Sequence, residues 1–170
     1  MTLKKILTLT MLFALTMTSF AQVKIKGDKK VVTRDRTVPF FDRIEVIDDI
    51  DVFIGYSTTP SVSVETDSNV QEFVLTEVSN GVLSIKIDDV IVRNKTLAVH
   101  LKVNEQLKEI YAYNNAKISS RNLIEVDSLI INGFDNSSFD LKLRSKLMLI
   151  NGKKSSKMTM EVLCDEITLR

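Results

Sequence analysis

The stretch INGFDNSSFDL over residues 131–141 returns as INGKKSSKMTM over residues 150–160, 19 residues later. A fainter copy, IYAYNNAKI, occupies residues 110–118. Each copy alternates apolar and polar residues, passes through a small polar turn and alternates again, which is typical of two β-strands joined by a turn. A period of about 20 residues predicts strands that stack on their own copies, because one copy alone cannot bury its apolar face. The stretch therefore predicts an all-β fold, a parallel β-helix (β-solenoid) with coils of about 20 residues.

Equivalent positions in the copies predict what the stacked strands share. The aligned positions on either side of the turn are apolar: Ile110, Ile131 and Ile150 before it, and Ile118, Phe139 and Met158 after it. Asn132 aligns with Asn151, so a ladder of asparagines is expected to bond neighbouring coils. Gly133 and Gly152 follow, and a positive φ is expected there because glycine adopts it at little cost.

Strand patterns continue toward the N-terminus of the chain. Apolar and polar residues alternate over residues 43–46, 62–65, 82–87 and 97–103. Residues 67–75 have helical spacing and predict at most one short helix or turn. Ser79-Asn80-Gly81 predicts a turn in which Gly81 takes a positive φ. With five glycines, two prolines and no low-complexity linker, the chain beyond residue 21 is expected to form one domain.

The first residues have the pattern of an export signal. Lys4 and Lys5 precede an apolar run over residues 6–17, which is too short to span a bilayer. Small residues at Ser19 and Ala21 favour cleavage after Ala21. We therefore expect a signal peptide over residues 1–21 and a single mature domain over residues 22–170, without a stable membrane span after cleavage. An uncleaved membrane anchor is the alternative.

Charge and cysteine content narrow the function classes further. Without the two signal-peptide lysines the chain has 21 basic and 22 acidic residues, a net charge of −1. This balance excludes the strong positive field that attracts nucleic acid or an anionic membrane. The single cysteine, Cys164, allows no internal disulfide, and its place in an alternating strand predicts a buried apolar side chain. An exported protein of a Gram-negative bacterium, in the periplasm or at the cell surface, fits these features.

No catalytic, cofactor-binding or metal-binding residues are predicted. His100, the only histidine, lies on the polar face of a regular strand, so a structural role is expected. Asp48, Asp49 and Asp51 could hold calcium, but they lack the spacing of a dedicated calcium loop. Bacterial β-helices include polysaccharide-active enzymes with paired carboxylates. Here Asp135 and Asp140 are replaced by Lys154 and Thr159 in the next copy, so no carboxylate row forms.

Exposed aromatic side chains are the remaining candidates for recognition. The chain has no tryptophan. Five phenylalanines are expected in the core: Phe40, Phe41, Phe53, Phe73 and Phe139. Tyr111 and Tyr113 share the face of a strand opposite to Ile110, and Phe134 adjoins a turn. Tyr111, Tyr113 and Phe134 are therefore the candidate recognition surface, with packing at the edge of the core as the alternative.

Several segments together resemble a known family. The stretches VPFFDRIEV over residues 38–46, IDVFI over residues 50–54 and VSVET over residues 62–66 are similar to the opening of the auto-transporter adhesin head domain of Bacteroidetes, called the GIN domain. NGVLSI over residues 80–85 and the Ile-Asn-Gly turns resemble that family too. Membership implies an exported, right-handed β-helical domain of unsettled function. It transfers no catalytic residue. The chain departs from the family pattern at Asp48-Asp49, where a glycine pair is common.

These observations predict a non-enzymatic protein of the cell envelope or surface, an adhesin-like head domain. Adhesion rests on the resemblance alone, and the ligand, a glycan or a surface protein, stays open. A polysaccharide-active β-helix enzyme and a periplasmic assembly module are the alternatives. The last strand pattern, over residues 167–170, predicts an exposed edge through which the chain could self-associate, and whether the natural chain continues past Arg170 is left open.

Overall fold

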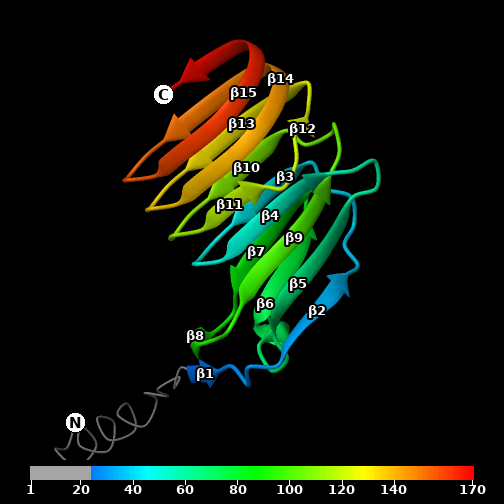
Figure 1. The fold of residues 1–170 in the computed structure, drawn as a ribbon, viewed down its shortest axis with the longest axis vertical. Helices are drawn as coiled ribbons and strands as arrows, with labels where there is room; N and C mark the ends of the chain where they lie inside the picture. Colours follow the sequence, from blue (N-terminus) through cyan, green and yellow to red (C-terminus); the bar gives the residue numbers. More distant parts are fainter. Residues whose placement is uncertain (1–23) are drawn as a thin grey trace, which may run out of the picture.

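The computed structural model describes residues 24–170 and consists almost entirely of β-strands (Figure 1). The predicted signal peptide, residues 1–21, lies outside these described residues. One short 3₁₀ helix, η1 Gln71–Phe73, is present at the position where a short helix or turn is predicted. The strands are β1 Lys24–Lys26, β2 Val31–Arg36, β3 Arg43–Val46, β4 Asp51–Tyr56, β5 Ser61–Asp67, β6 Val74–Ser79, β7 Val82–Ile87, β8 Val90–Arg93, β9 Leu97–Val103, β10 Glu109–Ala112, β11 Lys117–Ser120, β12 Ile124–Glu125, β13 Ser128–Gly133, β14 Ser138–Gly152 and β15 Lys157–Leu169.

Thirteen of these strands form a single sheet with both parallel and antiparallel neighbours. The order is β2-β5-β9-β4-β11-β14-β13-β10-β3-β7-β6, and β12 and β15 also pair with β14. The pairs β2–β5, β5–β9 and β6–β7 are antiparallel. The strands between β9 and β7 pair in parallel. β1 and β8 form a separate parallel pair.

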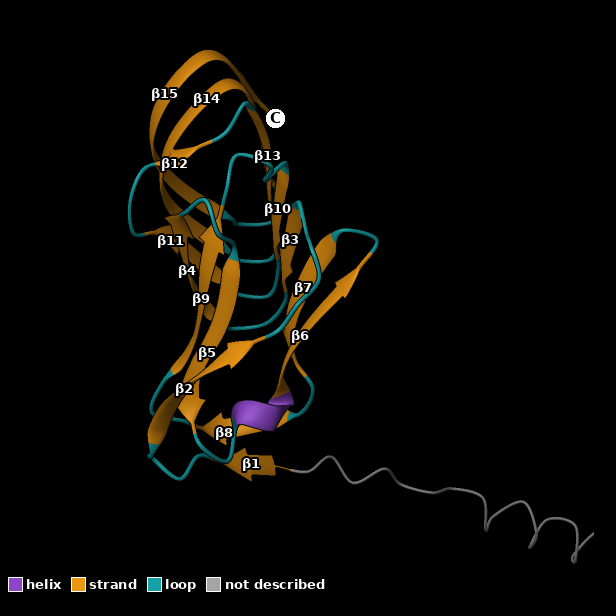
Figure 2. Cartoon of the chain, turned by 90° about the vertical axis from the view of Figure 1, so that its right-hand side faces the viewer, coloured by secondary structure: helices purple, strands orange, loops and turns teal. Residues whose placement is uncertain are grey.

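The sheet curls until its two halves face each other across the core. Figure 2 shows β4, β9 and β5 on one side and β10, β3 and β7 on the other, with β14 and β15 arching between them. β14 joins the halves because its first residues pair with β11 and its last residues pair with β13. Within the described residues β2 and β6 end the sheet without pairing to each other, so the sheet is nearly closed and barrel-like.

The prediction of a right-handed parallel β-helix is therefore wrong, although the all-β class is correct. Alternation of apolar and polar residues sets which face of a strand is buried, but it does not set the direction of the neighbouring strand. Asn80 and Gly81, with φ values of 50° and 78°, form a hairpin turn that makes β6 and β7 antiparallel. The strands β2, β5 and β9 lie outside the repeated segment and also pair in the antiparallel sense.

Within the repeated segment the predicted register is confirmed. Ile110 pairs with Ile131 and Ile131 with Ile150, while Ile118 pairs with Phe139 and Phe139 with Met158. The first five of these six side chains are at most 7% exposed and lie in one core cluster, against which Met158 is partly buried. The 19-residue period thus places like side chains above one another in the core.

The prediction of a positive φ at Gly133 and Gly152 is wrong. Positive φ values fall instead on two consecutive residues in each turn: Asn114 and Asn115, Asp135 and Asn136, and Lys154 and Ser155. The amide of Ala116 donates to the carbonyl of Tyr113, and the equivalent bond recurs in the next two copies. These features define type I′ turns, which connect the two halves of the sheet.

The core also corrects two predictions for phenylalanines. Phe41 and Phe139 are buried as expected, but Phe40 is 61% exposed. Phe53 is half-buried on the outer face, where its ring stacks on His100. Over residues 24–170, no helix has the length and apolar character needed to cross a bilayer.

Candidate functional site

Three aromatic side chains form what we call the aromatic ladder: Tyr111, Tyr113 and Phe134. Ile110 and Ala112 are fully buried, so the alternation of β10 turns the intervening Tyr111 and the following Tyr113 outward. The rings of Tyr111 and Tyr113 are nearly parallel, 4° apart, with centroids separated by 6.5 Å. Tyr113 and Phe134 differ by 5° and lie 4.9 Å apart. The candidate recognition residues thus form one continuous stack.

The type I′ turns explain how the ladder is built. Tyr113 and Phe134 each occupy the first position of such a turn. The amide of Phe134 donates to the carbonyl of Ala112 on the neighbouring strand, which sets the two turns side by side. Offset parallel rings at this separation attract each other by roughly 0.5–1.5 kcal/mol beyond the burial of their area.

A groove of about 400 Å³ adjoins the ladder on the side of β3, β7 and β6. We call it the acidic groove. Its polar lining consists of Glu45, Glu77, Glu109, Arg43, Ser79 and Ser84. Tyr111 and Tyr113 also line the groove, whereas Phe134 does not. Phe134 therefore packs on Tyr113 from the side of β13, and the groove borders the tyrosines from the opposite side.

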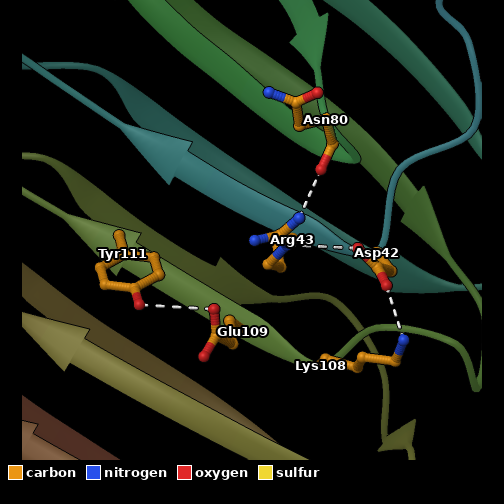
Figure 3. A network of polar contacts seen from close by, with 6 residues as sticks. All are labelled: Asp42, Arg43, Asn80, Lys108, Glu109 and Tyr111. Atoms are coloured by element: carbon orange, nitrogen blue, oxygen red, sulfur yellow. Dashed lines mark hydrogen bonds and ion pairs between the residues drawn. The ribbon is translucent and has the colours of Figure 1, made fainter.

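A hydrogen-bond network holds the rim of the groove (Figure 3). The guanidinium of Arg43 donates to the carbonyl of Asn80 and, at 3.4 Å, to Asp42 Oδ1. Lys108 Nζ donates to Asp42 Oδ2 at 2.7 Å. This bond lowers the pKa of the Asp42 carboxyl below its ordinary value. Asp42 therefore stays ionised and anchors Arg43 beside the β6–β7 hairpin.

The tyrosines are held in their neutral form. The Tyr111 hydroxyl donates to Glu109 Oε2 at 3.4 Å (Figure 3). Burial and the nearby charge of Glu109 raise the pKa of Tyr111. Burial and the charge of Glu45 raise the pKa of Tyr113 in the same way. Both phenols are therefore neutral, apolar ring surfaces near neutral pH.

The carboxylates of the groove are not neutralised by neighbours. Among residues 24–170, Glu45, Glu77 and Glu109 form no ion pair with a basic side chain. Arg43 is the one basic side chain in the lining described here, and it already pairs with Asp42. The groove therefore carries an excess of negative charge beside its two aromatic rings.

A second hollow, of about 680 Å³, is larger but internally paired. It lies beside β12 and the bend of β14, and its lining includes Tyr56 and Cys164. Arg144 Nη1 pairs with Glu125 at 3.0 Å, and Lys146 Nζ pairs with Asp127 at 2.7 Å. Because these charges satisfy one another, the acidic groove is the better candidate for recognition.

The structure gives His100 a structural place, half-buried on the outer face. Its Nε2 lies 2.7 Å from Glu65 Oε2, and its Nδ1 lies 2.8 Å from Arg121 Nη2. Since an arginine can only donate, Nδ1 accepts and Nε2 carries the proton donated to Glu65. Ser63 lies opposite His100 in the register, but neither ring nitrogen is left to serve it as a base.

The remaining sequence candidates are also engaged in local contacts. Asp49 and Asp51 pair with Lys117 Nζ at 3.1 and 3.4 Å, and the bond to Asp49 raises the pKa of Lys117. Asp135 pairs with Lys154 at 3.2 Å. Within the described residues no three His, Cys, Asp or Glu side chains gather as metal ligands. Cys164, predicted to be buried, is only partly buried.

The sequence identified the ladder but missed the groove. Strand alternation already turns Arg43 and Glu45 outward, beside buried Ile44 and Val46. Their neighbours, however, come from β10 and β7, which follow 66 and 39 residues later in the register. That pairing could not be read from spacing, because the repeat does not extend to β3.

The fold and the site define an all-β surface domain that presents an aromatic ladder and an acidic groove on the outer face of its sheet. The chain belongs to the family described as "Putative auto-transporter adhesin, head GIN domain", whose profile matches residues 40–169. The resemblance noted in the sequence is thereby confirmed. No curated protein matches the chain.

Solved structures with the same fold come from related bacteria. A "putative adhesin" from Parabacteroides distasonis is 21% identical with a TM-score of 0.71, over 87% of this chain and 68% of that one. A "putative lipid binding protein" from the same species is 17% identical with a TM-score of 0.67, over 86% of this chain and 65% of that one. A "putative adhesin" from Parabacteroides merdae is 18% identical with a TM-score of 0.61, over 88% and 80%. At these identities the likeness concerns the fold.

Proposed function

We propose that the protein is an exported, non-enzymatic recognition domain that binds a glycan through the aromatic ladder and the acidic groove. The observation that carries the proposal is the pair of nearly parallel tyrosine rings bordering a groove lined with carboxylates and hydroxyls. Aromatic faces pack against the apolar faces of sugar rings, while the polar lining can bond hydroxyl groups. Family membership and the predicted signal peptide support a place in the periplasm or at the cell surface.

The test is a glycan and host-matrix array probed with the purified protein and two variants. The double variant Tyr111→Ala/Tyr113→Ala is expected to lose at least tenfold in affinity for the glycans that the wild type binds. Phe40→Ala is the matched control, because Phe40 is an exposed aromatic residue that does not line the groove. A blank array, or equal losses in the two variants, would refute the proposal.

A further inference from the structure

We infer that the acidic groove selects amino sugars, whose ammonium group binds among Glu45, Glu77 and Glu109 while the sugar ring packs on Tyr111 and Tyr113. This inference rests on the proposed glycan-binding function and adds the chemical class of the ligand. Three features carry it: the charge of the groove, the place of the tyrosines, and the neutral polar groups between them.

The charge of the groove favours a cation. The three carboxylates come from three different strands, β3, β6 and β10, and converge on one groove. None forms an ion pair within residues 24–170. Arg43 is turned toward Asn80 and Asp42 at the rim. An anionic sugar would be repelled by this lining, and a neutral sugar would leave its charge unmatched.

The tyrosines favour a cation that is attached to a flat apolar surface. An ammonium group within about 6 Å of an aromatic ring centre is attracted to the face of the ring. Two nearly parallel rings 6.5 Å apart offer a broad platform rather than a closed cage. A pyranose ring that bears an amine supplies both the apolar face and the charge.

Neutral polar groups complete the lining. Ser79 and Ser84 contribute hydroxyl groups that donate and accept hydrogen bonds, as sugar hydroxyls require. At about 400 Å³ the groove is within the range of roughly 300–1,000 Å³ that is usual for small-ligand sites. The combination of carboxylates, aromatic faces and hydroxyls matches an amino sugar better than an isolated ammonium ion.

The test compares two oligosaccharides of equal length and linkage. Oligomers of glucosamine carry ammonium groups, whereas oligomers of N-acetylglucosamine are neutral. Calorimetric titration is expected to give at least tenfold tighter binding of the glucosamine oligomer, and added salt should weaken that binding because it screens the charges. The double variant Glu45→Gln/Glu77→Gln is expected to abolish the preference while the variant still binds the neutral oligomer. Glu72→Gln, an exposed glutamate outside the groove, is the control.

The outcomes separate the inference from the function beneath it. Equal binding of the two oligomers would overturn the inference and leave glycan binding standing. Binding of neither oligomer, together with binding of other glycans on the array, would also overturn only the inference. A blank array would overturn both. Equally tight binding of an oligolysine peptide would assign the site to basic protein side chains and overturn the choice of sugar.

Discussion

Gly133 shows at the residue scale why the repeat has a glycine after its asparagine. A Cβ at this position would lie 2.7 Å from Met158 Cε and 3.0 Å from the ring of Phe139 and from Ser156 Cβ. Phe139 is buried and cannot move freely. Gly133→Ala is therefore expected to lower the free energy of unfolding by roughly 1–3 kcal/mol, measured by urea denaturation.

Gly152, one copy later, is the internal control for this prediction. The nearest atom to its added Cβ is Ser156 Oγ at 3.1 Å, followed by Met158 Cε at 3.8 Å, and the residue is exposed. Gly152→Ala should therefore destabilise the protein less than Gly133→Ala. Equal effects would show that the glycines serve backbone conformation rather than close packing.

The tyrosines provide a pH-dependent prediction. Burial, together with a nearby glutamate, raises the pKa of all three, Tyr56, Tyr111 and Tyr113. Because the folded-state pKa lies above the unfolded value of about 10, their contribution to stability is complete below that pH and is lost as the pH rises through the folded values. Titration of the phenolate absorbance should therefore begin later in folded protein than in denatured protein.

A glutamine substitution assigns part of that shift. Glu109 is the largest cause after burial for the raised pKa of Tyr111. Glu109→Gln is expected to bring the ionisation of one tyrosine to lower pH and to leave the other two unchanged. Coincident titration of the folded and denatured proteins would contradict the prediction.

Charge pairs on the surface show what the period could have predicted. The ion pairs between neighbouring copies join residues 19 apart: Glu125 with Arg144, Asp127 with Lys146, Asp135 with Lys154, and Lys142 with Glu161. The amide of Asn151 donates to Asn132 Oδ1 over the same spacing. These contacts follow from the register alone. Each exposed pair contributes little, about 0–1 kcal/mol, so they adjust the stack rather than drive it.

At the scale of the elements, His100 connects four strands. It lies on β9, accepts from Arg121 after β11, donates to Glu65 on β5 and stacks on Phe53 of β4 with ring centroids 5.4 Å apart. In a double-mutant cycle, His100→Ala and Glu65→Ala are expected to be coupled by about 1 kcal/mol or more in the free energy of unfolding. Additive effects would show that the contact does not hold β5 to β9.

The same elements show where sequence reasoning stops. Alternation correctly predicted strands over residues 43–46, 82–87 and 97–103, because burial of one face requires it. It could not predict that β5 would lie antiparallel between β2 and β9, since side-chain alternation is the same in either direction. The Asn80-Gly81 turn was the one local signal of an antiparallel pair, and it was given too little weight against the repeat.

For the candidate site the division is similar. Tyr111, Tyr113 and Phe134 were predicted because alternation and turns are local properties of the chain. The acidic groove depends on which strands become neighbours, and Glu45, Glu77 and Glu109 are separated by more than 30 residues at each step. Such convergence is a property of the closed sheet, and no spacing rule applies to it.

At the scale of the whole molecule, the sheet has an apolar end. Four of the six exposed large apolar side chains lie on β14 and β15: Leu147, Leu163, Ile167 and Leu169. Within the described residues β15 pairs with β14 alone, so its other edge offers free backbone groups. Met158, Met160 and Val162 on the inner face of β15 are only partly buried. An edge of this kind is a template for pairing with a second strand.

We therefore predict that the protein self-associates through β15. Sedimentation equilibrium is expected to show a mass that increases with protein concentration. The double variant Leu163→Lys/Ile167→Lys should reduce the association, because both side chains are exposed and the added charges repel across a paired edge. Val92→Lys, an equally exposed apolar position on β8, is the control and should associate like the wild type. A monomer at every concentration, or equal weakening by the control, would show that the β15 edge is not an interface between copies of this chain.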